Sequence, residues 1–307
     1  MEPKRVPITR VFYTLLALLS IIVVLWVPSI YGDFLWFQEL GYDSVFLTIL
    51  GYQVVLFAVA FLVALGVLYA SYWVTIRNVR HAAESPGALA YQFGIVILAL
   101  LFGLRYAAEW EVVLRFLHAT PFGVTDPIYG QGVSFYVFTL PVVNLVIGFL
   151  LYLTIAGLLV SLVVYARYLG ITMQETPTGE VQAFNPIVYL SNLQTHAFGH
   201  LMAYIGAALV LLGVQYYIDR FELLYSTRGA VFGMGATDQA IFQPLLVLLA
   251  ITAVLGGLVV LANSRLEDAR AFYIPIAILL GFLIVGTAAG SAYQTFVVEP
   301  DEFNKEV

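Results

Sequence analysis

The sequence predicts an all-α fold: a polytopic membrane helix bundle of about seven transmembrane helices, with short interfacial helices in its outer loops. Composition is the first observation, because the 307 residues are 62% hydrophobic and their mean hydropathy is +0.94, far above a soluble domain. Block length is the second, because crossing a hydrocarbon core takes about 20 apolar residues. Such blocks occupy residues 11–30, 45–74, 86–104, 140–165, 201–218, 245–262 and 272–293.

These blocks belong to a single transmembrane domain, residues 1–296, because no segment between them is long enough for a separate soluble domain. Residues 297–307 are expected to form an outer tail. The first block is longer than the 7–15 residues of a typical signal-peptide core and lacks an A-x-A-like exit, so we expect a retained span.

Basic residues favour a cytoplasmic N-terminus and an outer C-terminus, because lysine and arginine in short loops tend to stay inside. This orientation also places most of the acidic residues outside. We therefore expect a multi-pass protein of the cell membrane. The basic residues then assigned to the inside are Lys4, Arg5, Arg10, Arg77, Arg80, Arg167, Arg265 and Arg270.

Local signals predict the ends of several helices. Asp33 as N-cap and Gly41 as a stop would bound an interfacial helix over 34–40. The block over 45–74 is too long to cross the membrane upright and must tilt or protrude. Past residue 104 the helix is expected to continue, with two ion pairs spaced four residues apart, Arg105 with Glu109 and Glu111 with Arg115. In an alternative interpretation, Arg105 and Glu109 gate a vestibule.

Turn signals divide the later part of the chain. Asp126-Pro127 predicts a turn before the fourth span, and Asn185-Pro186 predicts a helix start after a turn at 177–179. Thr237 or Asp238 is expected to cap the segment that leads to the sixth span. Gly286 and Gly290 form a small-residue face, which favours packing within the chain over dimerisation.

Several chemistries lack the residues they need. The chain has no cysteine and a net charge of −6, which excludes thiolate sites and argues against nucleic-acid binding. Its lysines stand at positions 4 and 305, outside the last span, where a retinal protein needs one. His196 and His200 are four residues apart but lack a third ligand, so we expect no metal and no cofactor. No charged residue lies inside the predicted spans, which argues against a proton-coupled carrier.

Four segments carry a family resemblance: "DFLWFQELGYDSVFLTILGYQ", "TPFGVTDPIYGQGVSFYVFTLP", "YYIDRFELLYSTRGAVFGMGATDQ" and "VVEPDEFNKE". In this order they resemble uncharacterised protein family 0182, a group of large prokaryotic integral membrane proteins. The resemblance implies about seven N-terminal spans followed by a large extracytoplasmic domain, and it implies no activity, substrate or cofactor. The chain ends soon after "EPDEFNKE", so we expect a truncated or naturally short form.

Charged residues of the outer loops are expected to fold together as a collar. Asp219 is expected to cap a new turn after the fifth span, with Glu222 at the capping-box position. Arg220 and Arg228 would then pair with acids of neighbouring loops. The candidate collar residues, structural or ligand-binding, are Asp126, Asp219, Arg220, Glu222, Arg228 and Asp238.

Three functions remain open at the level of sequence. The leading hypothesis is a non-catalytic membrane module that anchors or assembles an extracytoplasmic domain or protein partner, surrounded by the lipid bilayer. The second is a transport or channel subunit for an apolar or lipid-like substrate, which a cavity lined by Gln53, Asn144 and Gln215 would favour. The third is an outer-leaflet enzyme, which needs at least two of Asp126, Asp219, Glu222, Asp238 and His118 to converge around a cleft. The oligomeric state is left open.

Overall fold

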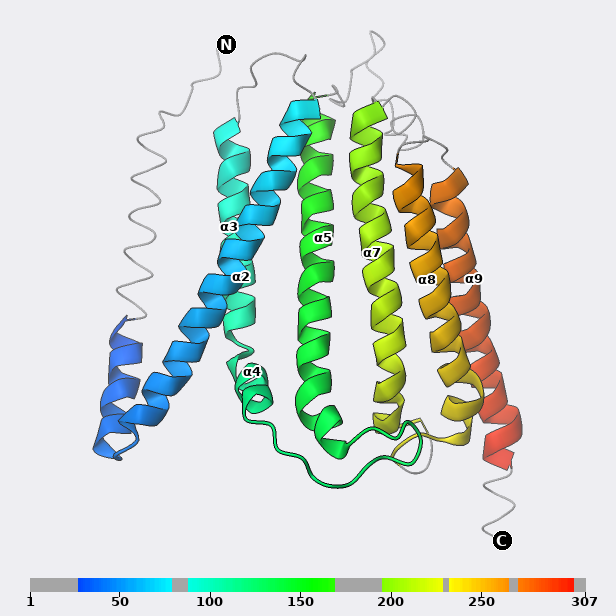
Figure 1. The fold of residues 1–307 in the computed structure, drawn as a ribbon, viewed down its shortest axis with the longest axis horizontal. Helices are drawn as coiled ribbons and strands as arrows, with labels where there is room; N and C mark the ends of the chain where they lie inside the picture. The colour runs from blue at the N-terminus through cyan, green and yellow to red at the C-terminus, as the bar shows by residue number, and fades with distance from the viewer. Residues whose placement is uncertain (1–26, 79–87, 169–194, 229–231, 265–269, 301–307) are drawn as a thin grey trace, which may run out of the picture.

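The computed structural model describes residues 27–78, 88–168, 195–228, 232–264 and 270–300, and this part of the chain is a helix bundle without a β-strand (Figure 1). Besides the helical residues 27–39, its α-helices are α2 (Asp43–Asn78), α3 (Ala88–Ala107), α4 (Trp110–Leu117), α5 (Leu140–Tyr168), α7 (Thr195–Glu222), α8 (Gln243–Asn263) and α9 (Arg270–Tyr293). Short tight or wide helical turns flank them: η1 (Phe135–Thr139), η2 (Leu223–Tyr225), η3 (Asp238–Phe242) and η4 (Gln294–Val298).

Six helical segments in this part of the chain are long and apolar enough to cross a membrane: Asp43–Asn78, Leu89–Ala107, Phe135–Ala166, Ala197–Tyr225, Asp238–Asn263 and Arg270–Val298. They match six of the seven predicted blocks, each extended at one or both ends. Most of the block over 11–30 lies outside the described residues, so a seventh span stays a prediction. The turn at 177–179 and the helix start at Asn185-Pro186 also lie outside them.

The connection into α2 confirms one predicted helix end and corrects another. Gly41 has φ +76°, and its N–H donates to Gln38 O at 3.0 Å while Tyr42 N–H donates to Phe37 O at 2.8 Å. These two bonds are the Schellman pattern that ends a helix at a glycine. The N-cap assigned to Asp33 is wrong, because residues 27–39 are already helical and Asp33 lies inside that helix.

The length of α2 agrees with the expectation that this span tilts or protrudes. Its 36 residues extend about 54 Å at 1.5 Å per residue, against a hydrocarbon core of about 30 Å. Figure 1 shows α2 crossing α3 obliquely, whereas α5 and α7 run closer to parallel.

Two apolar cores lie on either side of α5. One contains Leu68, Ile95 and Leu153 and joins α2, α3 and α5, and the other contains Tyr165, Leu201 and Leu249 and joins α5, α7 and α8. Helix α5 therefore holds the two halves of the bundle together. Most apolar side chains outside these cores are exposed along the helices, as expected of surfaces that face lipid.

Glycines set how closely the later helices approach. A Cβ added to Gly257 of α8 would lie 2.7 Å from Gly206 O of α7, so the two backbones touch. On α9, a Cβ at Gly286 would lie 2.4 Å from Leu245 Cδ1, and one at Gly290 would lie 2.4 Å from Phe242 Cζ. The prediction that the Gly286 and Gly290 face packs within the chain is confirmed.

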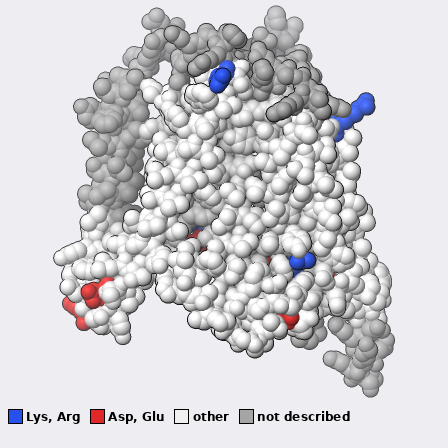
Figure 2. Space-filling view, viewed as in Figure 1, with Lys and Arg blue, Asp and Glu red and all other residues white. Residues whose placement is uncertain are grey.

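Charges are unevenly distributed between the two ends of the bundle. Figure 2 shows that the acidic side chains visible on this face all lie in its lower half, the half in which α4, η1, η3 and η4 lie in Figure 1. We call this end the collar end, because all six candidate collar residues lie in the helix ends and loops that meet there.

Candidate functional site

Asp126 organises the loop between α4 and η1. Its Oδ1 accepts hydrogen bonds from Ile128 N–H at 2.8 Å and Tyr129 N–H at 2.7 Å, and its Oδ2 accepts from Gln131 N–H at 3.0 Å and the Tyr136 hydroxyl at 2.6 Å. Gly130 N–H also donates to Asp126 O at 3.1 Å, which confirms the turn predicted at Asp126-Pro127. A short side chain that accepts from the residues after it suits this turn chemistry.

These contacts account for the electrostatics of Asp126. Partial burial alone would raise the pKa of its carboxyl, but the hydrogen bonds from the Tyr136 hydroxyl and from three backbone N–H groups outweigh burial and lower the pKa below its ordinary value. Asp126 is therefore held as a carboxylate whose acceptor positions are occupied by the protein, which is the arrangement of a structural residue.

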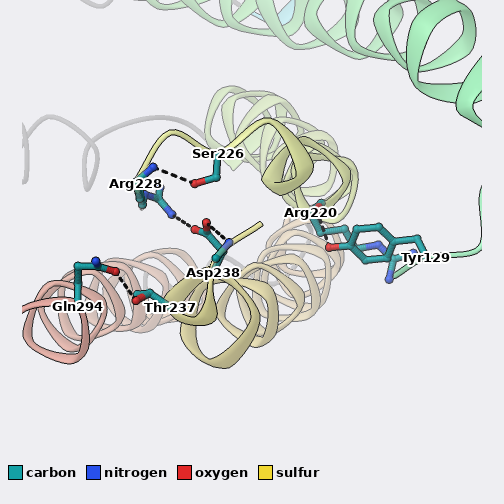
Figure 3. Close-up of polar contacts among 8 residues, drawn as sticks. Tyr129, Arg220, Ser226, Arg228, Thr237, Asp238 and Gln294 are labelled. Carbon is teal, nitrogen blue, oxygen red and sulfur yellow. Dashed lines mark hydrogen bonds and ion pairs between the residues drawn. The ribbon is translucent and has the colours of Figure 1, made fainter. Parts of the chain in front are cut away.

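Arg228 and Asp238 form the second part of the collar end (Figure 3). Arg228 Nη1 lies 2.8 Å from Asp238 Oδ1, and the Asp238 side chain is 1% exposed. Asp238 Oδ2 also accepts from Gly235 N–H at 3.3 Å, while Gln239 N–H makes the first helical bond, to Gly235 O at 3.1 Å. Asp238 thus sits at the third helical position and reaches back to the cap residue, as the acid of a capping box does.

The Thr237 cap prediction is wrong, since the helix starts earlier and its hydroxyl has another use. Thr237 makes no cap hydrogen bond but donates to Gln294 Oε1 of η4 at 2.5 Å (Figure 3). This bond ties the ends of the last two spans to each other.

Arg220 does not form the ion pair that was predicted for it. Its guanidinium carbon lies over three aromatic rings, 3.9 Å from the ring centre of Tyr217, 4.6 Å from that of Phe221 and 5.6 Å from that of Tyr129. Its Nη2 donates to the Tyr217 hydroxyl at 2.8 Å, and no acid of the described residues pairs with it. The expected ion pair with a neighbouring loop is therefore found for Arg228 and not for Arg220. Three aromatic rings, rather than an acidic side chain, stabilise the Arg220 cation.

The backbone of Arg220 links the first loop to α7. The Tyr129 hydroxyl donates to Arg220 O at 2.7 Å (Figure 3). The Tyr129 ring packs edge-on against Phe221 at 5.1 Å between ring centres. Together with Tyr136 and Leu140, Phe221 forms a small buried cluster beneath the loops. The loop before η1 is thereby fixed to the end of α7.

Asp219 and Glu222 do not form the predicted capping box. Helix α7 continues through both residues, and η2 follows without a break, because the apolar and aromatic pattern around Phe221 keeps this last turn buried. Asp219 Oδ1 instead accepts from Gln215 Nε2 at 2.6 Å, and Glu222 Oε1 accepts from Asn144 Nδ2 at 2.5 Å. Gln215 Nε2 also donates to Asn144 Oδ1 at 3.1 Å, which connects the two acids through a pair of amides between α5 and α7.

Both ion pairs predicted beyond α3 are present. Arg105 pairs with Glu109, and Arg115 pairs with Glu111 at 2.5 Å. The uninterrupted helix expected there is wrong, because the chain turns at Ala108 and Glu109 and resumes as α4 in a different direction (Figure 1). The turn lets the apolar face of α4 pack on α2 and α5.

A cleft of about 430 Å³ lies where these groups meet. It is bordered by α3, α4, α5 and α7, and its polar lining includes Arg105, Glu109, Asn144 and Gln215. Asn144 and Gln215 are two of the three residues expected to line a transport cavity, and Gln53 does not reach it. Arg105 and Glu109 border this cleft, but their side chains are 63% and 26% exposed, so they are not buried as the vestibule interpretation requires.

Two kinds of feature were missed at the level of sequence. Single π-helical turns, η1, η3 and η4, stand at the collar end of α5, α8 and α9, and no sequence pattern is known to mark them, although π turns often lie at functional sites. A buried seam also joins α2 to α5, where the hydroxyls of Ser71 and Ser161 lie 2.8 Å apart.

Of the two histidines spaced four residues apart, His200 has a structural role. His200 Nδ1 lies 3.0 Å from the Tyr165 hydroxyl, which also accepts from Asn78 Nδ2 at 2.8 Å. The side chain of His196 lies outside the described part. Within the residues that were placed, no group of three histidine or acidic side chains could hold a metal ion.

Six long apolar helices and polar loop ends gathered at one end define the class of the protein: an α-helical, multi-span membrane protein. The chain belongs to the Uncharacterised protein family (UPF0182), whose family profile matches residues 10–307. No solved structure matches it.

Relatives from distant prokaryotes support this assignment. A UPF0182 protein of Methanospirillum hungatei is 31% identical over 283 residues, which cover 90% of this chain and 31% of the relative. A UPF0182 protein of Cupriavidus necator is 31% identical over 306 residues, which cover 94% of this chain and 32% of the relative. A UPF0182 protein of Mycobacterium marinum is 32% identical over 296 residues, which cover 90% of this chain and 28% of the relative. The chain spans about a third of the length of these curated relatives.

Proposed function

We propose that this bundle is a non-catalytic membrane module of the cell membrane, and that its collar end faces outward and seats an extracytoplasmic domain or protein partner. The observation that carries the proposal is that the collar end is cross-linked by its own polar groups. Two hydrogen bonds join residues far apart in the chain, Tyr129 to Arg220 O and Thr237 to Gln294, and the ion pair of Arg228 with Asp238 joins η3 to the loop before it. A support of this kind needs a fixed shape and no reactive group.

The acids of the collar end also support a structural role over a catalytic one. Asp126 and Asp238 are engaged by donors from their own loops. A general acid or base must reach a substrate proton, so these two carboxylates would first have to give up the bonds that hold the loops.

An exposed aromatic side chain marks a seat for a partner. Phe232 lies in the loop between η2 and η3 and is 71% exposed, outside the six candidate spans. Large aromatic anchors of this kind are enriched in protein interfaces.

Orientation is tested with single cysteines, because the chain contains no native one. Ser44→Cys, Ser134→Cys and Ser226→Cys place a thiol at the collar end, and Arg77→Cys places one at the other end. In intact cells, a reagent that cannot cross the membrane should label the first three and spare the fourth until the membrane is permeabilised. The reverse pattern would overturn the orientation.

Anchoring is tested in a longer relative, such as the Methanospirillum hungatei protein. Its segment aligned with this chain and its remaining segments would be produced as separate polypeptides in one cell and purified through a tag on the first. We expect them to co-elute in detergent at a fixed ratio. Independent elution, with both parts folded, would contradict the anchoring role.

A further inference from the structure

The cleft at the collar end runs along α5 as well as across its end. Its lining on α5 begins at Pro141 and continues past Gly148 to Tyr152, about 16 Å along the helix axis at 1.5 Å per residue. Gly148 lies midway, and a Cβ there would meet nothing closer than the Tyr152 ring at 3.8 Å. The absence of a side chain at position 148 therefore keeps the cleft open.

The amide pair beside this cleft uses three of its four N–H donors within the protein. Asn144 Nδ2 donates to Glu222, and Gln215 Nε2 donates to Asn144 and Asp219. Among the described residues none donates to Gln215 Oε1. This oxygen is therefore an acceptor that a hydrogen-bond donor on a ligand can use.

Charge favours the same kind of ligand. Arg105 and Glu109 line the cleft as an ion pair, with side chains 63% and 26% exposed. These two are the charged side chains of the lining, one base and one acid, whereas Asp219 and Glu222 contact the amides and do not line the cleft themselves. A zwitterion can lie antiparallel to the ion pair, with its anion at Arg105 and its cation at Glu109.

An apolar surface borders the polar one. A second hollow of about 170 Å³ shares Tyr106 and Leu145 with the cleft, and its other lining residues, from α2, α4 and α5, are apolar. A ligand with a charged head and a hydrocarbon chain could contact both surfaces at once.

We propose that the cleft is a binding site for a phospholipid whose headgroup carries a primary amine. The phosphate contacts Arg105, the ammonium donates to Glu109 and Gln215 Oε1, and an acyl chain lies along Leu145 and Leu151. Selection against a trimethylammonium headgroup follows because it has no N–H to donate and would leave these acceptors unpaired. Selection against a glycerol headgroup follows because it carries no cation. This site does not depend on the anchoring role.

The test uses the purified full chain in detergent and native mass spectrometry. The probe is an equimolar mixture of phosphatidylethanolamine, phosphatidylcholine and phosphatidylglycerol with identical acyl chains, which differ in mass. We expect the first bound lipid to be phosphatidylethanolamine, in about tenfold excess over either competitor. Glu109→Gln should reduce this excess by about tenfold, the usual loss for one charge-assisted hydrogen bond.

Gly148→Leu fills the cleft and provides the sharpest variant. It should abolish the preference, whereas Gly66→Leu, at an exposed position of α2 with nothing within 4 Å of an added Cβ, should retain it. Equal occupancy by the three lipids, an excess of phosphatidylglycerol, or a preference that survives in both Gly148→Leu and Glu109→Gln would overturn the proposal. Glu109→Gln changes an exposed ion pair, so it gives a result even if Gly148→Leu fails to fold.

Discussion

Replacing Asp126 with asparagine should destabilise the collar end measurably. The amide keeps one acceptor oxygen, which still serves two of the four donors, and it presents an NH₂ group to the Gln131 N–H and Tyr136 hydroxyl that Oδ2 accepts. A hydrogen bond to a charged group contributes about 1.5–3 kcal/mol. The tyrosine hydroxyl can rotate to become the acceptor and the loop is partly exposed, so we expect a net loss of about 2 kcal/mol.

This loss is measurable as an apparent melting temperature in detergent. A destabilisation of this size corresponds to about 5 °C for a domain of this length class. Asp33→Asn is the matched control, because Asp33 is exposed within a helix and makes no comparable contacts. A melting temperature of Asp126→Asn equal to that of Asp33→Asn would refute the hydrogen-bonding role.

The same variant has a defined pH dependence. The pKa of Asp126 is lowered in the folded protein, so its carboxylate stabilises the fold above the ordinary pKa of an aspartate and this contribution is lost as pH falls through the lowered folded value. The gap in melting temperature between wild type and Asp126→Asn should therefore be constant near neutral pH and close below about pH 4. A gap that widens in acid would contradict the assignment.

Two further variants test packing and ion pairing. Arg228→Gln should lower the free energy of unfolding by about 3–5 kcal/mol, because it leaves the buried Asp238 unpaired. Arg115→Gln removes a partner from an ion pair that is exposed on both sides, and it should lower the free energy of unfolding by less than about 1 kcal/mol. Equal melting temperatures for the two variants would contradict this difference. Gly257→Leu should prevent a monodisperse elution peak, because an added Cβ meets α7 backbone, whereas Gly281→Leu, with open space around it, should elute as wild type does; a normal peak for both would contradict the close crossing.

The spans were predictable because hydrocarbon thickness imposes a length that any sequence must meet. The polar ends of the helices were less predictable than the spans, and α7 shows why. Asp219 stands after an apolar block, which favours a helix end, yet Phe221 is buried under the loops and extends the helix beyond it. That contact is with Tyr129, ninety residues away in the chain and invisible to local pattern.

The candidate site was likewise predictable only in part. The pair of Glu111 with Arg115 was predictable because both residues lie within α4, where helix geometry alone brings residues four apart together. The Arg228 pair depended on a loop path that composition does not specify. Of the three rings around Arg220, Tyr217 and Phe221 lie in the same helix, and only Tyr129 comes from a distant loop whose path the sequence does not specify. The cleft required the angle between α3 and α4.

The account depends most on the collar end being a fixed structure, and hydrogen exchange of its first loop measures this directly. The N–H groups of Ile128, Tyr129 and Gln131 donate to Asp126. In detergent at neutral pH we expect peptides covering 124–133 to exchange slowly in the wild type and much faster in Asp126→Asn. Wild-type exchange as fast as that of an unstructured peptide would show an open loop and contradict the central claim.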